Sequence, residues 1–179
     1  GAVFYVDLFA GRIKEIQKRI PYLKELGITF IHIMPVFSTP SGETDGGYAV
    51  SSYRDVNSRF GTMSDLRDLS HSLEENGMRL ILDFILNHTS DQHDWAIKAK
   101  EGDPKYQDYY YTFDERQELD EYSPFLRDIF PEARKGSFTF NKEMQKWVWT
   151  TFHSYQWDLN YSNPAVFLQM MREMFFLAE

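Results

Sequence analysis

Strand and helix signals alternate over the first half of the chain, and this alternation limits the fold more than any other feature. Three apolar runs rich in β-branched and aromatic residues are expected to form strands, at 3–8, 30–34 and 79–85. The last run is nearly continuous in apolar character, which fits a parallel strand buried on both faces. Longer segments with helical spacing separate the runs. The pattern predicts right-handed βαβ units in a parallel sheet.

The segments between these strands carry helix-start and helix-stop signals. The first, at 13–26, has apolar residues at intervals of three and four, and Pro21 inside it predicts a kink or a split into two helices. Gly27 is expected to close it. The second follows Thr62, which predicts an N-cap with Asp65 in the capping-box position.

The alternation stops after the third strand. Residues 87–162 are interrupted by prolines and are dense in Tyr, Asp, Glu and Arg. A structureless loop of that length is unusual in a compact domain. We therefore predict an inserted subdomain at the carboxyl end of the third strand, with a strand pair at 137–141 and 146–150.

Helix signals return near the end of the chain. Asn163 followed by Pro164 predicts a helix start, with an apolar face made of Val166, Met170, Met174 and Leu177. A complete (β/α)8 barrel needs about 250 residues. The expected division is therefore a partial (β/α)8 barrel with three parallel strands at 1–86, an inserted domain at 87–162 and a barrel helix at 163–179.

Composition excludes several classes of function. The formal net charge is −8 and no basic run is present, so we expect no nucleic-acid partner. No stretch of about 18 apolar residues exists, so no membrane span is expected. There are no cysteines, which excludes disulfides and thiolate metal sites. No leader is visible, so a cytoplasmic location is favoured unless the native N-terminus lies upstream of Gly1.

Polar residues at the carboxyl ends of the predicted strands are the candidates for chemistry, because sites in parallel sheets and barrels lie there. Asp7 is expected inside the first strand. Asp83 and Asn87 share a side of the third strand by the two-residue period, and His88 leaves that strand at its open end. Asp83 is either a site residue or a structural carboxylate with satisfied hydrogen bonds. His88 is either a donor to a sugar hydroxyl or a loop histidine bonded to backbone.

The tetrapeptide from Asp45 to Tyr48, with two glycines between them, follows the second strand. The glycines allow positive φ and bring the carboxylate and the phenol ring to one place. This pair suits a hexose, with hydroxyls on the acid and the apolar sugar face on the ring. The same four residues are also ordinary turn chemistry. Aromatic residues make up 17% of the chain, which suits either sugar stacking or an aromatic core.

Four ordered blocks together resemble one known family. The run DFILNH at 83–88 is similar to the first conserved region of the α-amylase superfamily, glycoside hydrolase family 13, and QWDLN at 156–160 is similar to its fifth. The runs DGGYAVSSYRDVN at 45–57 and WVWTTF at 147–152 resemble the amylosucrases within it. The resemblance covers the whole chain and implies the N-terminal part of a TIM barrel with a domain inserted after strand three.

The resemblance also implies roles for matching positions around a glucosyl ring. Asp45 and Tyr48 match the floor of the pocket that binds the ring, where Tyr48 stacks. His88 matches a histidine that contacts the hydroxyls of the ring. Phe152 matches an aromatic wall of the same pocket.

Four further positions match residues of the family with other roles. Arg127 and Phe130 match residues that shape the acceptor side. Asp83 matches an aspartate that supports the site. Asn87 matches a calcium ligand of calcium-dependent amylases. Amylosucrase-like members do not need that ion, so we expect neither a metal nor a cofactor.

The groups that break the glycosidic bond are expected outside this chain. Retaining glycosidases use a carboxylate nucleophile and an acid/base carboxyl about 5–5.5 Å apart. In the family that the chain resembles, the nucleophile follows strand four in an Arg-x-Asp setting and the acid/base glutamate follows strand five. No Arg-x-Asp stands near Glu179, so we expect both groups beyond it, and no turnover by residues 1–179 alone.

The resemblance therefore implies a retaining enzyme that acts on α-glucosides, with sucrose or an α-glucan as substrate and amylosucrase-like glucosyl transfer or hydrolysis as the reaction. The alternatives are an α-glucosidase or trehalose synthase of the same superfamily, or a non-catalytic sugar-binding barrel. A three-stranded part of a barrel also leaves open strand edges, which predicts self-association.

Overall fold

A computed structural model describes all of residues 1–179, and contacts group them into two compact units. The N-terminal unit comprises Gly1–Thr39, Gly46–Tyr48 and Ser52–Phe84. The C-terminal unit comprises Pro40–Asp45, Ala49–Ser51 and Ile85–Glu179. Short segments on either side of the Asp45–Tyr48 turn therefore belong alternately to one unit and to the other.

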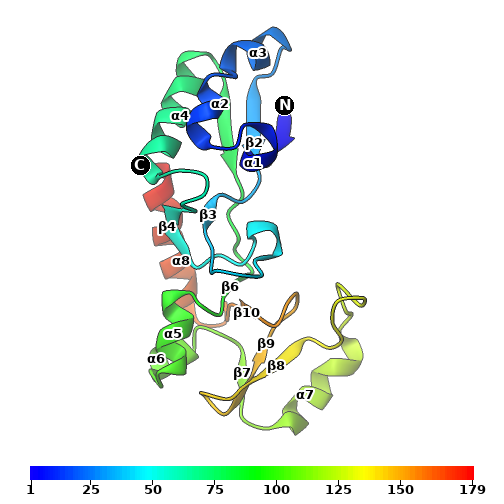
Figure 1. The fold of residues 1–179 in the computed structure, drawn as a ribbon. Coiled ribbons are helices and arrows are strands. Elements are labelled where there is room, and N and C mark those ends of the chain that lie inside the picture. Colours follow the sequence, from blue (N-terminus) through cyan, green and yellow to red (C-terminus); the bar gives the residue numbers. More distant parts are fainter. The chain divides into compact units, whose positions relative to one another are not determined.

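The N-terminal unit is built on a parallel sheet of three strands in the order β1 (Ala2–Phe4), β2 (Phe30–Ile33), β5 (Arg79–Leu82) (Figure 1). Both pairings are parallel, and each strand lies beside the next of the three along the chain. Three helices connect β1 to β2, and α4 (Met63–Glu75) precedes β5. Along the chain, a short antiparallel pair of strands follows β2 and precedes α4. It consists of β3 (Phe37–Ser38) and β4 (Ser52–Val56). The predicted parallel α/β arrangement is confirmed.

The helical segment predicted at 13–26 divides near its proline. It forms α2 (Ile13–Gln17) and α3 (Ile20–Glu25), with Pro21 in the first turn of α3. A proline fits there because its missing N–H would have no partner within the helix. Gly27 follows with a φ of 72°, the left-handed conformation of a helix stop.

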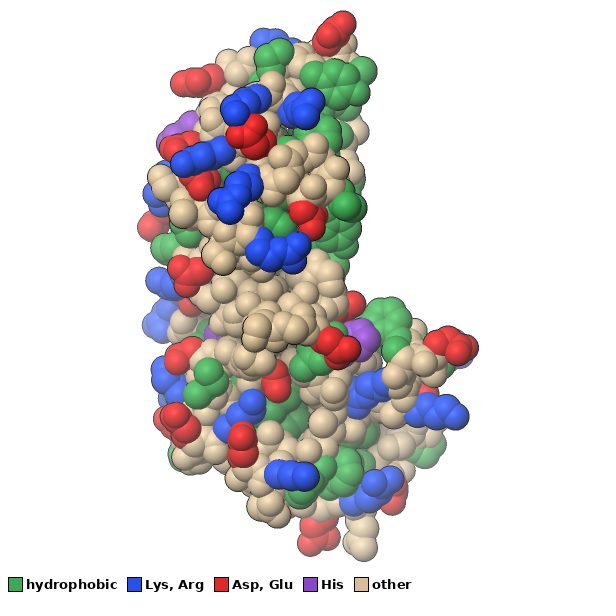
Figure 2. Space-filling view, in the orientation of Figure 1, with side chains coloured by type: hydrophobic (Ala, Val, Ile, Leu, Met, Phe, Trp, Pro, Cys, Tyr) green, Lys and Arg blue, Asp and Glu red, His purple; other side chains and the backbone are tan.

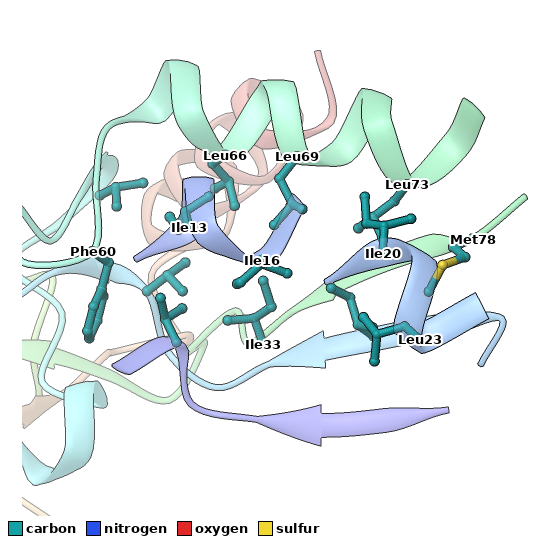
Figure 3. Packing of buried hydrophobic residues seen from close by; sticks show 14 residues of the cluster. Ile13, Ile16, Ile20, Leu23, Ile33, Phe60, Leu66, Leu69, Leu73 and Met78 are labelled. Atoms are coloured by element: carbon teal, nitrogen blue, oxygen red, sulfur yellow. The ribbon is translucent and has the colours of Figure 1, made fainter. Parts of the chain in front are cut away.

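The core of the N-terminal unit is mainly aliphatic. Ile13 and Ile16 of α2 lie between Leu69 of α4 and Ile33 of β2, and all four are fully buried (Figure 3). The helix residues recur at intervals of three and four, so one face of each helix covers the sheet. Fourteen residues form this cluster, and all of them are apolar.

The predicted capping box at the start of α4 is present. The hydroxyl of Thr62 accepts from the Asp65 backbone N–H at 3.2 Å, and the Asp65 carboxylate accepts from the Thr62 backbone N–H at 2.9 Å. Lys14 lies 3.1 Å from the same carboxylate, and its hydrogen bond lowers the pKa of Asp65. Two amides that α4 cannot satisfy internally are therefore bonded.

Two predicted strands are shorter than their apolar runs. The first ends at Phe4, and Asp7 lies in a one-turn helix, α1 (Val6–Phe9), rather than in the strand. The carboxylate stands in the first turn, where exposed amides favour a negative charge, and it accepts from the N–H of Leu8. β5 ends at Leu82, so Asp83 directly follows the strand. Strand propensity alone placed both boundaries too late.

The C-terminal unit contains two small antiparallel sheets (Figure 1). One pairs β6 (His88–Ser90) with β10 (Gln156–Asp158). The other has the order β7 (Thr112–Phe113), β9 (Lys146–Trp149), β8 (Phe138–Asn141). The predicted strand pair is thus confirmed as β8 and β9. The β6–β10 pair was not predicted, because strands of three residues leave no periodic pattern.

Helices complete the C-terminal unit. They are α5 (Asp94–Lys100), α6 (Pro104–Gln107), α7 (Arg116–Tyr122) and α8 (Pro164–Ala178). A turn of 3-10 helix, Ser123–Phe125, follows α7. No helix of the chain is long and apolar enough to cross a bilayer.

The last helix begins as predicted but buries a different face. The side chain of Asn163 accepts from the Ala165 N–H at 2.9 Å, so it caps α8. Val166 and Met170 are buried, whereas Met174 is exposed and Glu173 takes the buried position. Steps of four and then three residues keep 166, 170 and 173 on one stripe. Gln169 donates to a carboxyl oxygen of Glu173 at 3.0 Å, so this buried polar side chain has a hydrogen-bond partner.

Charged side chains of both signs are interspersed on the face of the molecule that Figure 2 shows. Lys and Arg do not gather into a single-sign patch on either unit in that view.

Candidate functional site

The turn that carries Asp45 and Tyr48 depends on its two glycines. Asp45, Gly46 and Gly47 all have positive φ, of 50°, 65° and 103°. A side chain at Gly47 would place its Cβ 3.1 Å from the carbonyl oxygen of Pro35, so both conformation and space require glycine there. Asp45 is one of two non-glycine residues of the chain with positive φ. The predicted glycine-dependent turn is therefore confirmed.

In the N-terminal unit the turn brings Tyr48 to Asp83. The phenol of Tyr48 donates to Asp83 Oδ2 at 3.2 Å, while Nε2 of His32 lies 2.8 Å from Oδ1. Both oxygens of this carboxylate are thus bonded, which fits a supporting residue rather than a free acid. His32 comes from the middle of β2 and was not among the predicted site residues.

In the C-terminal unit one glutamine joins Asp45 to His88. Nε2 of Gln156 lies 3.1 Å from Asp45 Oδ2 and 3.1 Å from Nε2 of His88. His88 and Gln156 are buried on the paired strands β6 and β10. A carboxylate and an imidazole from distant parts of the chain thereby share one hydrogen-bond network.

Aromatic rings line the same cluster. Phe152 packs on His88 with ring centres 5.1 Å apart, and Phe130 lies 6.2 Å from Phe152. Phe130 also stacks on His153 with ring centres 5.2 Å apart, and Tyr155 stacks on His153 at 5.1 Å. Phe152, the predicted wall residue, therefore packs on His88, and Phe130, predicted on the acceptor side, packs on Phe152.

The stacked imidazole of His153 also approaches Asp45. Its Nε2 lies 3.6 Å from Asp45 Oδ1, on the carboxylate oxygen that Gln156 does not bind. The two oxygens of Asp45 thus face two side chains of the short 153–156 segment. His153 and Gln156 were not predicted as site residues, although Gln156 opens one of the recognised motifs.

Arg127 is the predicted residue that the cluster does not include. It is exposed on the segment after the 3-10 turn, and no hydrogen bond or ion pair joins it to Asp45, His88 or Phe152. Its role on the acceptor side stays a prediction.

The residues around Asn87 do not fit a metal ion. The Asn87 side chain bonds to Asp158, and its Nδ2 lies 3.3 Å from Nδ1 of His88. Asp158 is buried and also accepts from the backbone N–H of Thr151 at 3.2 Å and from the Thr151 hydroxyl. Burial raises the pKa of Asp158 to about 6. Calcium needs six to eight oxygen ligands, and no group of three or more His, Asp or Glu side chains converges in residues 1–179.

Known sequences resemble the chain over nearly its whole length. The alpha amylase catalytic domain, as a sequence family, matches residues 7–179. The trehalose synthase/amylase TreS of Mycolicibacterium smegmatis is 34% identical over 157 residues, which are 87% of this chain and 26% of that protein. The 4-alpha-glucanotransferase of Thermotoga neapolitana is 34% identical over 170 residues, which are 94% of this chain and 36% of that protein.

A solved structure with bound sugar has the same fold. It is an isomaltulose synthase mutant from Erwinia rhapontici NX5 in complex with its natural substrate sucrose, with a TM-score of 0.81 and 31% identity. The match covers 96% of this chain and 30% of that one. The chain thus spans between 26% and 36% of the length of these three proteins.

Proposed function

The chain belongs to the alpha-amylase catalytic-domain family, glycoside hydrolase family 13, and from this membership we propose that its protein transfers or hydrolyses α-glucosyl units with retention of configuration. Sucrose is the proposed donor, and an α-glucan or water is the proposed acceptor. The sucrose complex of the similar isomaltulose synthase supports this choice of donor. Amylosucrase-like transfer is the proposed subtype, on the runs at 45–57 and 147–152.

One observation carries this proposal, the meeting of Asp45, His88 and Phe152 in the C-terminal unit. A hexose offers hydroxyls around its ring and apolar C–H faces. Carboxylate oxygens accept from hydroxyls, an imidazole exchanges hydrogen bonds with them, and an aromatic ring packs on the C–H face. These three side chains together supply all three kinds of contact.

Tyr48 and Asp83 have a related proposed role in the N-terminal unit. Tyr48 supplies an aromatic face for the glucosyl ring. Asp83 holds the side chain of Tyr48 in place through the hydrogen bond of 3.2 Å from its phenol. His32 holds the carboxylate in turn at 2.8 Å. Because its hydrogen bonds orient both partners, Asp83 acts through Tyr48 rather than on the sugar.

On the acceptor side, Phe130 is the proposed aromatic contact, because it packs against Phe152 and His153 and remains partly exposed. Arg127 is the proposed polar partner of the acceptor on the same exposed segment. Its long, flexible side chain can reach a second sugar without a fixed partner in the free protein.

The proposed chemistry is a double displacement through a β-glucosyl-enzyme. It needs two carboxyl groups about 5–5.5 Å apart, one as nucleophile and one as acid/base. Gln156 holds Asp45, so we assign Asp45 to binding. Tyr48 and His32 hold Asp83, so we assign Asp83 to support. We propose that the nucleophile and the acid/base lie outside residues 1–179, and that these residues by themselves are inactive.

The test is an assay of the full-length protein on sucrose and on maltose-type substrates. We expect glucose or fructose release from sucrose. Release from maltose alone would favour an α-glucosidase or trehalose synthase reaction, which the 34% identity to TreS supports as the alternative subtype. Release from neither substrate would overturn the enzyme proposal.

A non-catalytic sugar-binding barrel is the alternative from a different class. Such a protein would keep the Asp45, His88 and Phe152 contacts but would lack the nucleophile. Isothermal titration with sucrose separates the two, because the binder gives heat of binding with no product, whereas the enzyme gives product.

We also propose that residues 1–179 self-associate. β1 and β5 are the edge strands of the three-stranded sheet, so each has one side that pairs with neither of the other two strands. Unpaired edges are templates for strand addition. Light scattering tests this proposal, and a monomer at high protein concentration would contradict it.

A further inference from the structure

Gln156 uses every hydrogen-bonding atom of its side chain in the C-terminal unit. It is the first residue of β10, fully buried, and 111 residues from Asp45 and 68 from His88 along the chain. We propose that Gln156 is a positioning residue, which orients the Asp45 carboxylate and the His88 imidazole together and sets which nitrogen of His88 carries the proton. The consequence for catalysis rests on the proposed function, whereas the proton position does not.

The orientation of the Gln156 amide follows from its oxygen. Oε1 accepts from the backbone N–H of His153 at 3.0 Å, and a backbone N–H can only donate. The other end of the amide is therefore the NH2 group, which has two hydrogens. One is directed to Asp45 Oδ2 and the other to His88 Nε2, each at 3.1 Å.

This orientation determines the tautomer of His88. Because Gln156 donates, Nε2 of His88 must accept, and a neutral imidazole then carries its hydrogen on Nδ1. Asn87 has the opposite preference, since its Nδ2 lies 3.3 Å from Nδ1. The Asn87 contact is longer and its residue is exposed, whereas Gln156 is buried and held by three partners. The geometry therefore favours the Nδ1–H form.

The same glutamine also limits the motion of Asp45. Asp45 has a positive φ of 50°, a backbone conformation that residues other than glycine rarely adopt. Its carboxylate receives the Gln156 N–H on one oxygen and faces His153 on the other, at 3.6 Å. A sugar that binds Asp45 and His88 then meets two groups that are already ordered, so ordering them does not weaken binding.

The experiment is nitrogen NMR of the histidine side chains in the full-length protein near neutral pH. The chain has five histidines, and the His88 signal is assigned by its loss in His88→Gln. We expect the wild-type signal of the Nδ1–H form. Gln156→Leu and Gln156→Glu remove the donor to Nε2, while Asn87 Nδ2 still lies 3.3 Å from Nδ1, so we expect the His88 signal to move toward the Nε2–H form.

A second readout is turnover. Both variants lose the charge-assisted hydrogen bond to Asp45 and the neutral one to His88. Their kcat/KM should therefore fall about tenfold to a hundredfold. The matched control is Gln107→Leu, because Gln107 is a partly buried glutamine that bonds only the Ala99 carbonyl, at 3.0 Å. We expect it to leave the His88 signal and kcat/KM unchanged.

Two results would overturn the inference. One is a wild-type His88 in the Nε2–H form, which needs no variant and so does not depend on whether the variants fold. The other is a folded Gln156→Leu or Gln156→Glu variant with the wild-type His88 signal. If wild type lacks activity on every α-glucoside, the proposed function fails, but the NMR result still decides the role of Gln156.

Discussion

The two units differ in the number of polar side chains that they bury. The cluster in the N-terminal unit is entirely apolar, and Asp65 is the one buried polar or charged side chain of that unit. In the C-terminal unit the buried polar or charged side chains are His88, Thr89, Ser90, His93, Ser137, Thr150, Gln156, Asp158 and Glu173. Buried polar groups are costly unless they are bonded. We infer that the first unit is mainly a scaffold and that the second keeps its polar network to hold binding groups.

The largest expected effect tests the apolar half of this comparison. Leu69→Ala removes a fully buried side chain of α4 that packs against α2, so we expect a loss of about 2–5 kcal/mol in the free energy of unfolding. Urea denaturation measures it. Leu8→Ala is the matched control, because Leu8 is 82% exposed and its change should stay within about 0.5 kcal/mol. Equal losses in the two variants would show that this cluster is not the core.

The next effect tests the polar half through its dependence on pH. Burial lowers the pKa of His93 from 6.5 to about 4. The neutral ring accepts from the backbone N–H of Trp95 at 3.2 Å and caps α5. Between pH 6.5 and about 4, His93 is protonated in the unfolded chain but neutral in the folded one. Stability should therefore fall as pH decreases from about 6.5 to 4, by up to about 3 kcal/mol.

His93→Asn is the variant that isolates this effect, since asparagine also caps helices but does not titrate. Urea denaturation at several pH values should show a flatter profile between pH 6.5 and 4 in the variant than in wild type. The charged neighbours Asp94, Glu173 and Lys98 remain in both proteins, so their contributions largely cancel. Parallel profiles would mean that His93 does not couple folding to pH.

The smallest effect concerns a local signal of the scaffold. Thr62→Ala removes the hydroxyl of the capping box, so we expect a loss of about 1 kcal/mol. Thr29→Ala makes the same chemical change at an exposed position and should be close to neutral. A larger loss from Thr29→Ala than from Thr62→Ala would contradict the assignment of the cap.

The same contrast explains what the sequence could predict. In the N-terminal unit, Pro21, Thr62 and Asp65 act on residues within one helical turn, so their effects appear in the local pattern. The helix at Asp7 was missed because the apolar run continues past the end of β1.

In the C-terminal unit the decisive contacts are not local. Asp45 and Gln156 are 111 residues apart, and no periodic pattern relates them. The resemblance to the α-amylase family indicated Asp45, His88 and Phe152, but not that a glutamine would join them. His32 and His153 were missed for the same reason, because each becomes a site neighbour through pairing of distant segments.

Replacing Asp45 tests most directly whether the polar network of the C-terminal unit binds a glucosyl ring. The measurement is kcat/KM for sucrose of the full-length wild type and of Asp45→Asn. Asparagine keeps the size but loses the charge, so we predict a fall of about tenfold to a hundredfold, with residual turnover clearly above background. An unchanged kcat/KM would show that Asp45 does not contact the sugar. Complete loss of turnover in a folded variant would instead identify it as a reacting carboxylate, which contradicts its assignment to binding.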